Sequence, residues 1–156
     1  MKILITGASG LIGRALTTEL KAQGHTVIAA VRREARRNDE VQWDPAGGAL
    51  SPSAFDGVDA VVHLAGAGIG DKRWTDSYKK EILESRTLST ALLARTMAAL
   101  DKKPSVFLSG SAIGYYGAQQ DEKLDETSAL GEGFLADICA QWEQAAQPAI
   151  DAGIRT

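Results

Sequence analysis

The sequence predicts a doubly wound α/β fold, in which a parallel sheet is covered by helices on both faces. Short apolar runs rich in β-branched residues alternate with longer helical patterns along the chain. The first of these runs passes through a glycine-rich turn directly into a helix. The chain has 156 residues, 44% of them hydrophobic, which fits one domain with a sizeable core. We therefore expect a single three-layer α/β/α domain.

The first strand and its turn predict a phosphate site. Residues 3–5 are apolar, and three glycines follow at three-residue spacing, at Gly7, Gly10 and Gly13. A helix then runs to Gly24, and its apolar positions share one face, which we expect to be buried: Leu11, Ile12, Ala15, Leu16 and Leu20. Such a turn presents backbone N–H groups at a positive helix N-terminus, so this order predicts a Rossmann-like pyrophosphate site. The alternative is a tight turn whose glycines serve only packing.

The second strand, residues 25–31, leads into a group of arginines. An acidic residue at its end would accept hydrogen bonds from a ribose 2′-hydroxyl and favour NAD. This chain has Arg32 and Arg33 there, followed by Arg36 and Arg37. A guanidinium group suits a 2′-phosphate, so we expect NADP in preference to NAD. A solvated basic loop is the alternative.

Three further strands are predicted at residues 40–43, 59–64 and 104–108, giving the strand order 3-2-1-4-5. Asp44 follows the third strand. Its carboxylate either accepts a hydrogen bond from an adenine amino group or has only a structural role in the loop. Pro45 and two glycines then form a turn. The fourth strand runs into Ala65 and Gly66, whose small size lets a cofactor approach the backbone. His63 lies among apolar neighbours, which indicates a hydrogen-bonded core histidine.

Two long helices and one loop complete the pattern. Residues 75–100 predict a helix, and five residues supply most of its buried stripe: Tyr78, Ile82, Leu92, Leu93 and Met97. Glu81 and Arg86, in its first half, are either cofactor contacts or solvated charges. Residues 119–133 predict a polar loop, and 134–152 a helix that Pro148 kinks or ends. Ser111 follows the fifth strand, where its hydroxyl can bond a substrate oxygen or the nicotinamide.

Composition narrows the function. The net charge of −3 argues against nucleic-acid binding and against adhesion to an acidic membrane. The single cysteine, Cys139, excludes an internal disulfide and is typical of a cytoplasmic protein. Two histidines and one cysteine without ligand spacing predict no metal site. Residues 153–156 have the pattern of a strand's beginning, so we expect domain 1–156 to stop before a sixth strand and a substrate-binding lobe. An open sheet edge would then be available for a homodimer.

Motifs along the whole chain carry a family resemblance: TGASGLIG at 6–13, WDP at 43–45, HLAG at 63–66, KRW at 72–74, SR at 85–86, SGSAIGYYG at 109–117 and WE at 142–143. In these the chain resembles the extended short-chain dehydrogenase/reductases. It is most similar to the NAD(P)-dependent epimerase/dehydratase-like proteins, sometimes labelled nucleoside-diphosphate-sugar epimerases. Members are commonly about twice this length, so the resemblance implies an N-terminal, cofactor-binding portion.

The resemblance implies a set of cofactor contacts: Gly7, Gly10, Leu11, Ile12 and Gly13 at the pyrophosphate, Arg32 with neighbouring Arg33 at the 2′-phosphate, Leu64, Ala65 and Gly66 along the adenosine and pyrophosphate, and Glu81 and Arg86 near the cofactor. It implies that Ser111 polarises a substrate oxygen. Family members also carry a tyrosine and a lysine four residues apart on the next helix, as general acid/base and its partner. Leu135 and Cys139 stand at those places.

This departure leaves two functions open. In the first, the protein is an NADP-dependent oxidoreductase or epimerase-like enzyme that acts on a small molecule such as a nucleotide sugar. Hydride then moves between the nicotinamide and a carbonyl or alcohol carbon, with Ser111 orienting the oxygen and Tyr115 or Tyr116 as the acid. The alternative for both tyrosines is packing around the nicotinamide end. In the second, the protein is a non-catalytic NADP-binding redox sensor or regulatory module.

Overall fold

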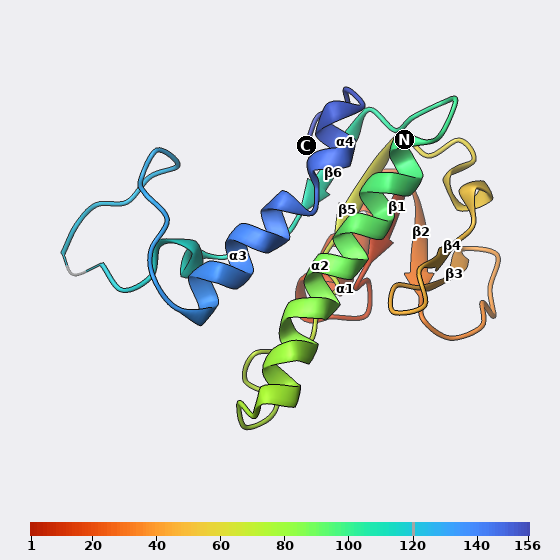
Figure 1. The fold of residues 1–156 in the computed structure, drawn as a ribbon. Helices are drawn as coiled ribbons and strands as arrows, with labels where there is room; N and C mark the ends of the chain where they lie inside the picture. The colour runs from red at the N-terminus through yellow and green to blue at the C-terminus, as the bar shows by residue number, and fades with distance from the viewer. Residues whose placement is uncertain (120) are drawn as a thin grey trace.

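A computed structural model describes residues 1–119 and 121–156 as one sheet flanked by helices (Figure 1). The strands are β1 (Lys2–Thr6), β2 (Thr26–Val31), β3 (Glu40–Asp44), β4 (Ala49–Leu50), β5 (Ala60–His63) and β6 (Val106–Ser109). The α-helices are α1 (Leu11–Ala22), α2 (Asp76–Ala98), α3 (Phe134–Gln144) and α4 (Gln147–Asp151), with 3₁₀ turns η1 (Pro52–Phe55) and η2 (Ile113–Tyr116). Residue 120, in the loop predicted for 119–133, lies outside the described residues.

The sheet confirms the predicted α/β class. Its order is β4-β3-β2-β1-β5-β6, so the five parallel strands stand in the predicted 3-2-1-4-5 order when β4 is left out. The prediction of a wholly parallel sheet was wrong at one edge, where β4 pairs antiparallel with β3. The chain reverses there through a turn in which Gly48 has a φ of 71°, a conformation that favours glycine. The sequence pattern showed the turn but not a two-residue strand.

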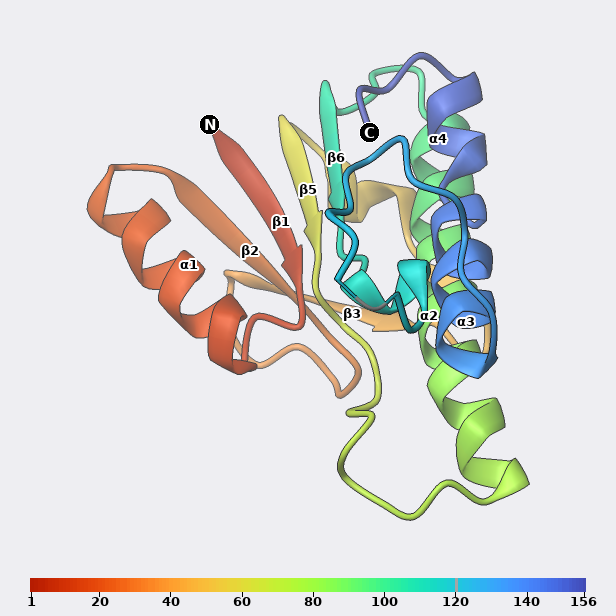
Figure 2. The same ribbon diagram turned by 90° about the vertical axis from the view of Figure 1, so that its left-hand side faces the viewer.

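The helices form two outer layers. Helix α1 covers one face of the sheet, and α2, α3 and α4 lie on the other (Figure 2). Side chains alternate along β1, so Ile3 and Ile5 pack toward α1, whereas Leu4 packs in the cluster of Phe107 from β6 and Leu93 from α2. All five residues of the stripe predicted for α2 are buried, which confirms its core-facing side.

The buried face predicted for α1 was partly wrong. Leu11 is 82% exposed and Ile12 67% exposed, and Ala15 is exposed as well. The buried residue of this helix is Gly13, because a Cβ there would lie 2.2 Å from the Gly7 carbonyl oxygen. Gly13 thus faces the turn after β1, and the first apolar residues of the helix point outward. Only the later positions, Leu16 among them, pack on the sheet.

The last helical segment is divided, as Pro148 predicted. Helix α3 ends at Gln144, and α4 restarts at Gln147 with the proline in its first turn. After α4 the chain returns to the sheet, where the Phe107 N–H donates to the Arg155 carbonyl at 2.8 Å. The edge beside β6, expected to be open, is therefore partly covered by this chain's own residues.

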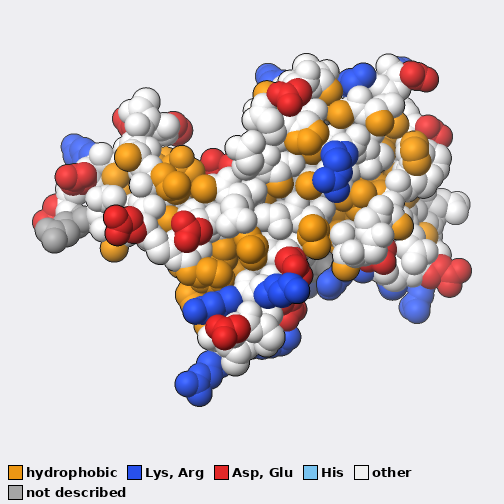
Figure 3. Space-filling view, viewed as in Figure 1, with side chains coloured by type: hydrophobic (Ala, Val, Ile, Leu, Met, Phe, Trp, Pro, Cys, Tyr) orange, Lys and Arg blue, Asp and Glu red, His pale blue; other side chains and the backbone are white. Residues whose placement is uncertain are grey.

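The face formed by α2, α3 and α4 carries apolar side chains between its charges (Figure 3). Leu88 on α2 is 42% exposed and Ile150 on α4 is 48% exposed. Homodimer formation stays a prediction. Within residues 1–119 and 121–156, no helix is both long and apolar enough to cross a membrane.

Candidate functional site

A groove of about 1250 Å³ lies at the carboxyl ends of β1, β2 and β5, where helices leave the sheet on opposite faces. Its wall is made by the turn after β1, the end of β2, the turn after β3, the segment after β5 and the first half of α2. It exceeds the volume of ordinary small-ligand pockets, about 300–1,000 Å³. The sequence-predicted residues that line it are Gly7, Gly10, Arg32, Arg33, Leu64, Ala65, Gly66 and Glu81.

The glycine turn combines packing with an open face. Gly7 has a φ of 69°, and a Cβ there would lie 2.7 Å from the Leu64 carbonyl carbon. Gly10 has an ordinary negative φ and is exposed in the groove, and a Cβ there would meet only the Gly7 oxygen at 3.3 Å. Packing alone thus accounts for Gly7 and Gly13 but poorly for Gly10. No side chain of the described residues caps α1, so its first-turn N–H groups are free for an anion.

The segment after β5 is held in place from behind by side-chain hydroxyls. The Thr6 hydroxyl oxygen accepts from the backbone N–H groups of Leu64 and Ala65, at 3.2 and 3.3 Å. The Ser85 hydroxyl on α2 accepts from the Ala67 N–H at 3.0 Å. These bonds fix the backbone that faces the groove; Thr6 lies outside the groove lining, whereas Ser85 is part of it.

His63 lies beneath this segment and is fully buried, as its apolar neighbours predicted. Its Nδ1 is 2.6 Å from the Thr6 hydroxyl, and its Nε2 is 2.9 Å from the Ser89 hydroxyl. Because the Thr6 oxygen already accepts two N–H groups, its proton points to Nδ1, so Nε2 carries the ring proton and donates to Ser89. Burial lowers the pKa of His63 to about 4. The ring is therefore a neutral link between β1, β5 and α2.

The arginines after β2 form the far end of the groove. Arg32 is exposed and lines the groove, with no hydrogen bond or ion pair from its side chain to the described residues. Arg33 is bound through both terminal nitrogens to Glu40, the first residue of β3. Asp44 also lines the groove, while its Oδ1 accepts from the N–H groups of Ala46 and Gly47 in the turn after β3. Asp44 therefore stabilises the turn through Oδ1, and Oδ2 stays available to accept from a ligand.

The two residues of α2 predicted near the cofactor, Glu81 and Arg86, differ in whether they line the groove. Glu81 lines the groove and accepts from Lys72 at 3.3 Å. Arg86 does not line it: its guanidinium donates to the Ile82 carbonyl, lies over the Trp142 ring at 5.2 Å and would meet a Cβ on Gly66 at 3.4 Å. Burial lowers the pKa of Arg86. Arg86 therefore supports the Gly66 backbone from the side of α3. Leu11, Ile12 and Gly13 also lie outside the groove lining.

The predicted catalytic residues gather after β6, outside the lining of the groove. The Ser111 hydroxyl donates to Glu143 Oε1 at 2.5 Å, a short charge-assisted bond. The rings of Tyr115 and Tyr116 lie edge to face, 5.3 Å apart. Partial burial, followed by nearby carboxylates such as Glu143, raises the pKa of Tyr116, so its phenol stays protonated.

Leu135 and Cys139, at the positions of the family's tyrosine and lysine, face this cluster. A Cβ on Gly114 would lie 3.4 Å from the Leu135 Cβ and 3.7 Å from the Cys139 sulfur. Both residues of α3 thus pack against η2, on the segment that carries Ser111. Burial raises the pKa of the Cys139 thiol, which keeps it neutral. The carboxylate nearest to Ser111 is instead Glu143, one helical turn after Cys139 on the same helix.

Sequence reasoning missed several residues that shape the site: Thr6, Glu40, Ser85, Ser89 and Glu143. Four of them form hydrogen bonds to residues distant in the sequence, and Glu40 binds the arginine loop directly before it. Thr6, Ser85 and Glu143 stood inside motifs that carried the family resemblance, which was the available signal. Among residues 1–119 and 121–156, no group of three His, Cys, Asp or Glu side chains is placed to hold a metal ion.

Comparison with known proteins gives consistent matches. The sequence model of the NAD dependent epimerase/dehydratase family matches residues 3–134. The chain is 41% identical over 153 residues to epimerase family protein Mb2239 of Mycobacterium bovis, covering 98% of this chain and 50% of that protein. It therefore spans about half the length of the curated relatives it matches.

Two solved structures are similar to the fold. One is the nucleoside-diphosphate sugar epimerase from Corynebacterium glutamicum, with a TM-score of 0.85 and 42% identity over 99% of this chain and 32% of that one. The other is human epimerase family protein SDR39U1 with NADPH, with a TM-score of 0.80 and 33% identity over 94% of this chain and 48% of that one.

Proposed function

Because the chain belongs to the NAD dependent epimerase/dehydratase family, as its motifs predicted, we propose that its groove binds a nicotinamide dinucleotide for hydride transfer. NADP(H) is the preferred cofactor and a small carbonyl or alcohol compound the substrate. The observation that carries the proposal is the position of the groove, at the carboxyl ends of β1 and β5 and at an uncapped helix N-terminus. The similar human protein is described with NADPH.

The residues present fit such a cofactor. Gly10 leaves room where a pyrophosphate meets the N–H groups of α1. The Thr6 hydroxyl on β1 fixes the backbone at Leu64 and Ala65, along which the cofactor would lie. Arg32 projects from the end of β2 into the same groove, where its guanidinium meets the 2′-phosphate of NADP(H).

The chemistry of the substrate end rests on Ser111 and Glu143. When bound, the nicotinamide accepts or supplies a hydride. Because the Ser111 hydroxyl donates to Glu143, its oxygen is left to accept a hydrogen bond from a substrate hydroxyl. The substrate proton then moves to Ser111 and the serine proton to Glu143, and the reverse direction returns both. A nucleotide sugar is the substrate class proposed, since the similar protein from Corynebacterium glutamicum is described as a nucleoside-diphosphate sugar epimerase.

The cofactor assignment is tested by titrating the chain with NADPH and with NADH and following nicotinamide fluorescence. Replacing Arg32 by alanine should weaken NADPH at least about tenfold, as expected for a lost charged hydrogen bond, and leave NADH within about twofold. The matched control is Arg36→Ala, which removes the same charge from the same loop at a side chain outside the groove lining. Equal losses for both nucleotides would refute a 2′-phosphate contact.

A second function is favoured by Leu135 and Cys139, which replace the family's proton-transfer pair. In that case the chain binds NADP(H) without turning it over and acts as a redox sensor or regulatory module. Assays of the longer protein with nucleotide sugars and small carbonyls discriminate the two. The enzyme function is supported if the parent turns over a substrate and Glu143→Gln loses that turnover but keeps its affinity for NADPH. The sensor function is supported if the parent binds NADPH but turns over no compound of the panel.

A further inference from the structure

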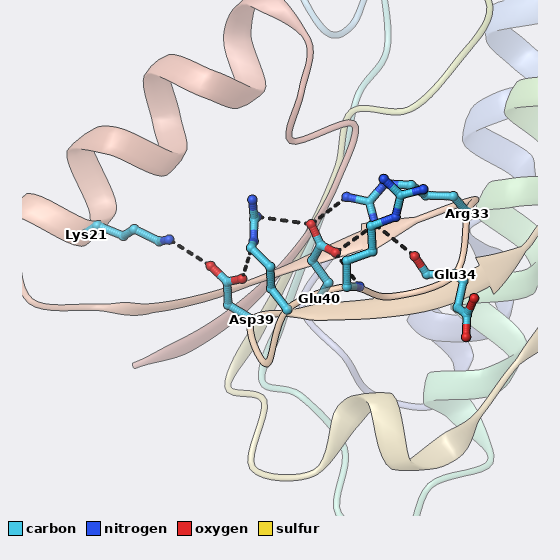
Figure 4. A network of polar contacts seen from close by, with 7 residues as sticks. Lys21, Arg33, Glu34, Asp39 and Glu40 are labelled. Atoms are coloured by element: carbon cyan, nitrogen blue, oxygen red, sulfur yellow. Dashed lines mark hydrogen bonds and ion pairs between the residues drawn. The ribbon is translucent and has the colours of Figure 1, made fainter.

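A chain of ion pairs joins the arginine loop to the sheet (Figure 4). Lys21 on α1 binds Asp39, Asp39 binds Arg37, and Arg37 reaches Glu40 at 3.1 Å. Glu40 is the centre of this network because its side chain is only 2% exposed, whereas that of Arg33 is 45% exposed. A buried carboxylate on a strand thus holds cations that lie at the surface.

The carboxylate of Glu40 is fully used by this loop. One oxygen accepts from Arg33 Nη2 at 2.7 Å and lies near Arg37. The other accepts from Arg33 Nη1 at 2.8 Å and from the Arg36 backbone N–H at 2.9 Å. These bonds, that from Arg33 first, lower the pKa of Glu40 to about 2, so it is ionised at neutral pH. The backbone of Glu40 is in register with Ala29 of β2, which anchors the carboxylate in the sheet.

Arg33 keeps one edge available while it is held. A guanidinium carries five N–H groups, and Arg33 uses three of them, two to Glu40 and one to the Glu34 carbonyl at 2.8 Å. The remaining two, on Nε and on Nη2, lie side by side on the other edge. Within the part of the chain that the structure describes, they have no partner, and Arg33 lines the groove next to Arg32. A phosphate can therefore bind this edge through two oxygens without displacing Glu40.

We propose that Glu40 is a positioning residue that determines cofactor specificity, by fixing Arg33 in the orientation that binds the 2′-phosphate of NADP(H). This inference rests on the cofactor proposed above and assigns discrimination to an Arg33–Glu40 unit together with Arg32. An unrestrained arginine on an exposed loop loses side-chain entropy when it binds a ligand. Glu40 removes most of that loss in advance, because the guanidinium and the loop backbone are already ordered.

A competing effect has the opposite sign. The negative charge of Glu40 repels a phosphate, so a purely electrostatic role would weaken NADPH binding. Four arginines stand against three acids, Glu34, Asp39 and Glu40, along residues 32–40, so the loop keeps a net positive charge with its pairs intact. The Arg33 guanidinium lies between the carboxylate and the phosphate and offsets this repulsion, whereas the two hydrogen bonds hold that guanidinium in place. The positional effect is therefore the larger.

The experiment compares NADPH, NADH and adenosine 2′,5′-bisphosphate on the unmodified chain and on Glu40→Gln, which keeps the size of the side chain but removes its charge. NADPH and the bisphosphate should bind about tenfold more weakly, while NADH stays within about twofold. NADH also reports folding, because a loss of folded protein weakens every nucleotide equally. The matched control, Asp39→Asn, removes the same charge from the same loop and leaves the Arg33–Glu40 bonds intact.

A double-mutant cycle identifies the partner. In an Arg33→Ala background, Glu40→Gln should change NADPH affinity less than about twofold, because the group that Glu40 positions is gone. The proposal is overturned if Glu40→Gln tightens NADPH, if it weakens NADPH and NADH alike, or if Asp39→Asn has the same effect. Absence of any nucleotide binding by the unmodified chain would refute the proposed function, and this inference with it. If the parent binds NADPH and NADH and Glu40→Gln binds both with the parent's affinities, this inference alone is refuted.

Discussion

Acidification should destabilise this chain through His63. The ring is buried and neutral, with Nδ1 accepting from Thr6 and Nε2 donating to Ser89. A proton added to Nδ1 would face the Thr6 hydroxyl hydrogen and break the link that holds the segment after β5. Thr6, Ser89 and the Trp43 ring lie around the imidazole, and burial accounts for its lowered pKa, so no carboxylate of the described residues compensates the charge.

The size of the effect follows from the shift in pKa. His63 has a pKa of about 4 in the folded chain and about 6.5 when unfolded. Between these values the unfolded state binds the proton and the folded state does not, so stability is fully present above pH 6.5 and is lost as the pH falls to 4. At 1.36 kcal/mol per unit, the loss is about 3 kcal/mol, a large part of the usual 5–15 kcal/mol of a domain. The pKa of Glu40 is lowered from 4.5 to about 2, so its contribution is lost mainly below pH 4.5 and meets the His63 window only near pH 4.

Urea unfolding followed by circular dichroism at a series of pH values from 4 to 8 measures the effect. His63→Gln should lower the free energy of unfolding at pH 7 by about 1–3 kcal/mol, since buried partners lose a bond, and should flatten the profile between pH 4 and 6.5. The matched control is His25→Gln, because His25 lies at the surface beside the N-terminal amine. A slope in the His63 variant equal to that of the parent would refute the reasoning.

Two further predictions concern local structure. Gly13→Ala should lower the free energy of unfolding in urea by about 1–3 kcal/mol, because its Cβ would lie 2.2 Å from the Gly7 carbonyl oxygen and displace α1. The same displacement should weaken the binding of NADPH and NADH together. A smaller loss of unfolding free energy than in Gly10→Ala would contradict the packing described. Thr75→Ala should lower the free energy of unfolding by about 1 kcal/mol, because its hydroxyl oxygen caps α2 by accepting from the Tyr78 N–H; Thr75→Ser should restore most of it.

The fold was largely predictable because its signals are local. Each parallel strand is a short apolar run with turn residues at its ends, and the order of strands follows from right-handed crossovers. The short strand β4 escaped prediction because two residues carry no periodicity. The rotation of α1 escaped it for a different reason: the apolar pattern of Leu11 and Ile12 indicated burial, but the contact of Gly13 with Gly7 sets the helix orientation.

The site was predictable only where the backbone itself forms the wall of the groove. The glycine turn and the segment at Leu64 face the groove as the sequence indicated, because strand ends in a doubly wound sheet meet at one edge. The placement of Arg86 was not predictable, since its neighbour Trp142 lies on a helix more than fifty residues away in sequence. Glu40 was interpreted only as the beginning of a strand, because its place in the sequence does not show that its carboxylate turns back to the arginine loop. Side chains that act through tertiary hydrogen bonds leave no spacing to detect.

The two networks around the groove differ in what they can regulate. The link through His63 is neutral, buried and composed of hydrogen bonds among β1, β5 and α2, so it holds the segment after β5 in one geometry that salt does not screen. The network of Glu40 is charged and lies largely at the surface, where screening and competition by anions act on it. A dinucleotide needs the same pyrophosphate geometry whether or not it carries a 2′-phosphate. The rigid network therefore suits the part of the ligand that NAD(H) and NADP(H) share, and the charged network suits the single group by which they differ.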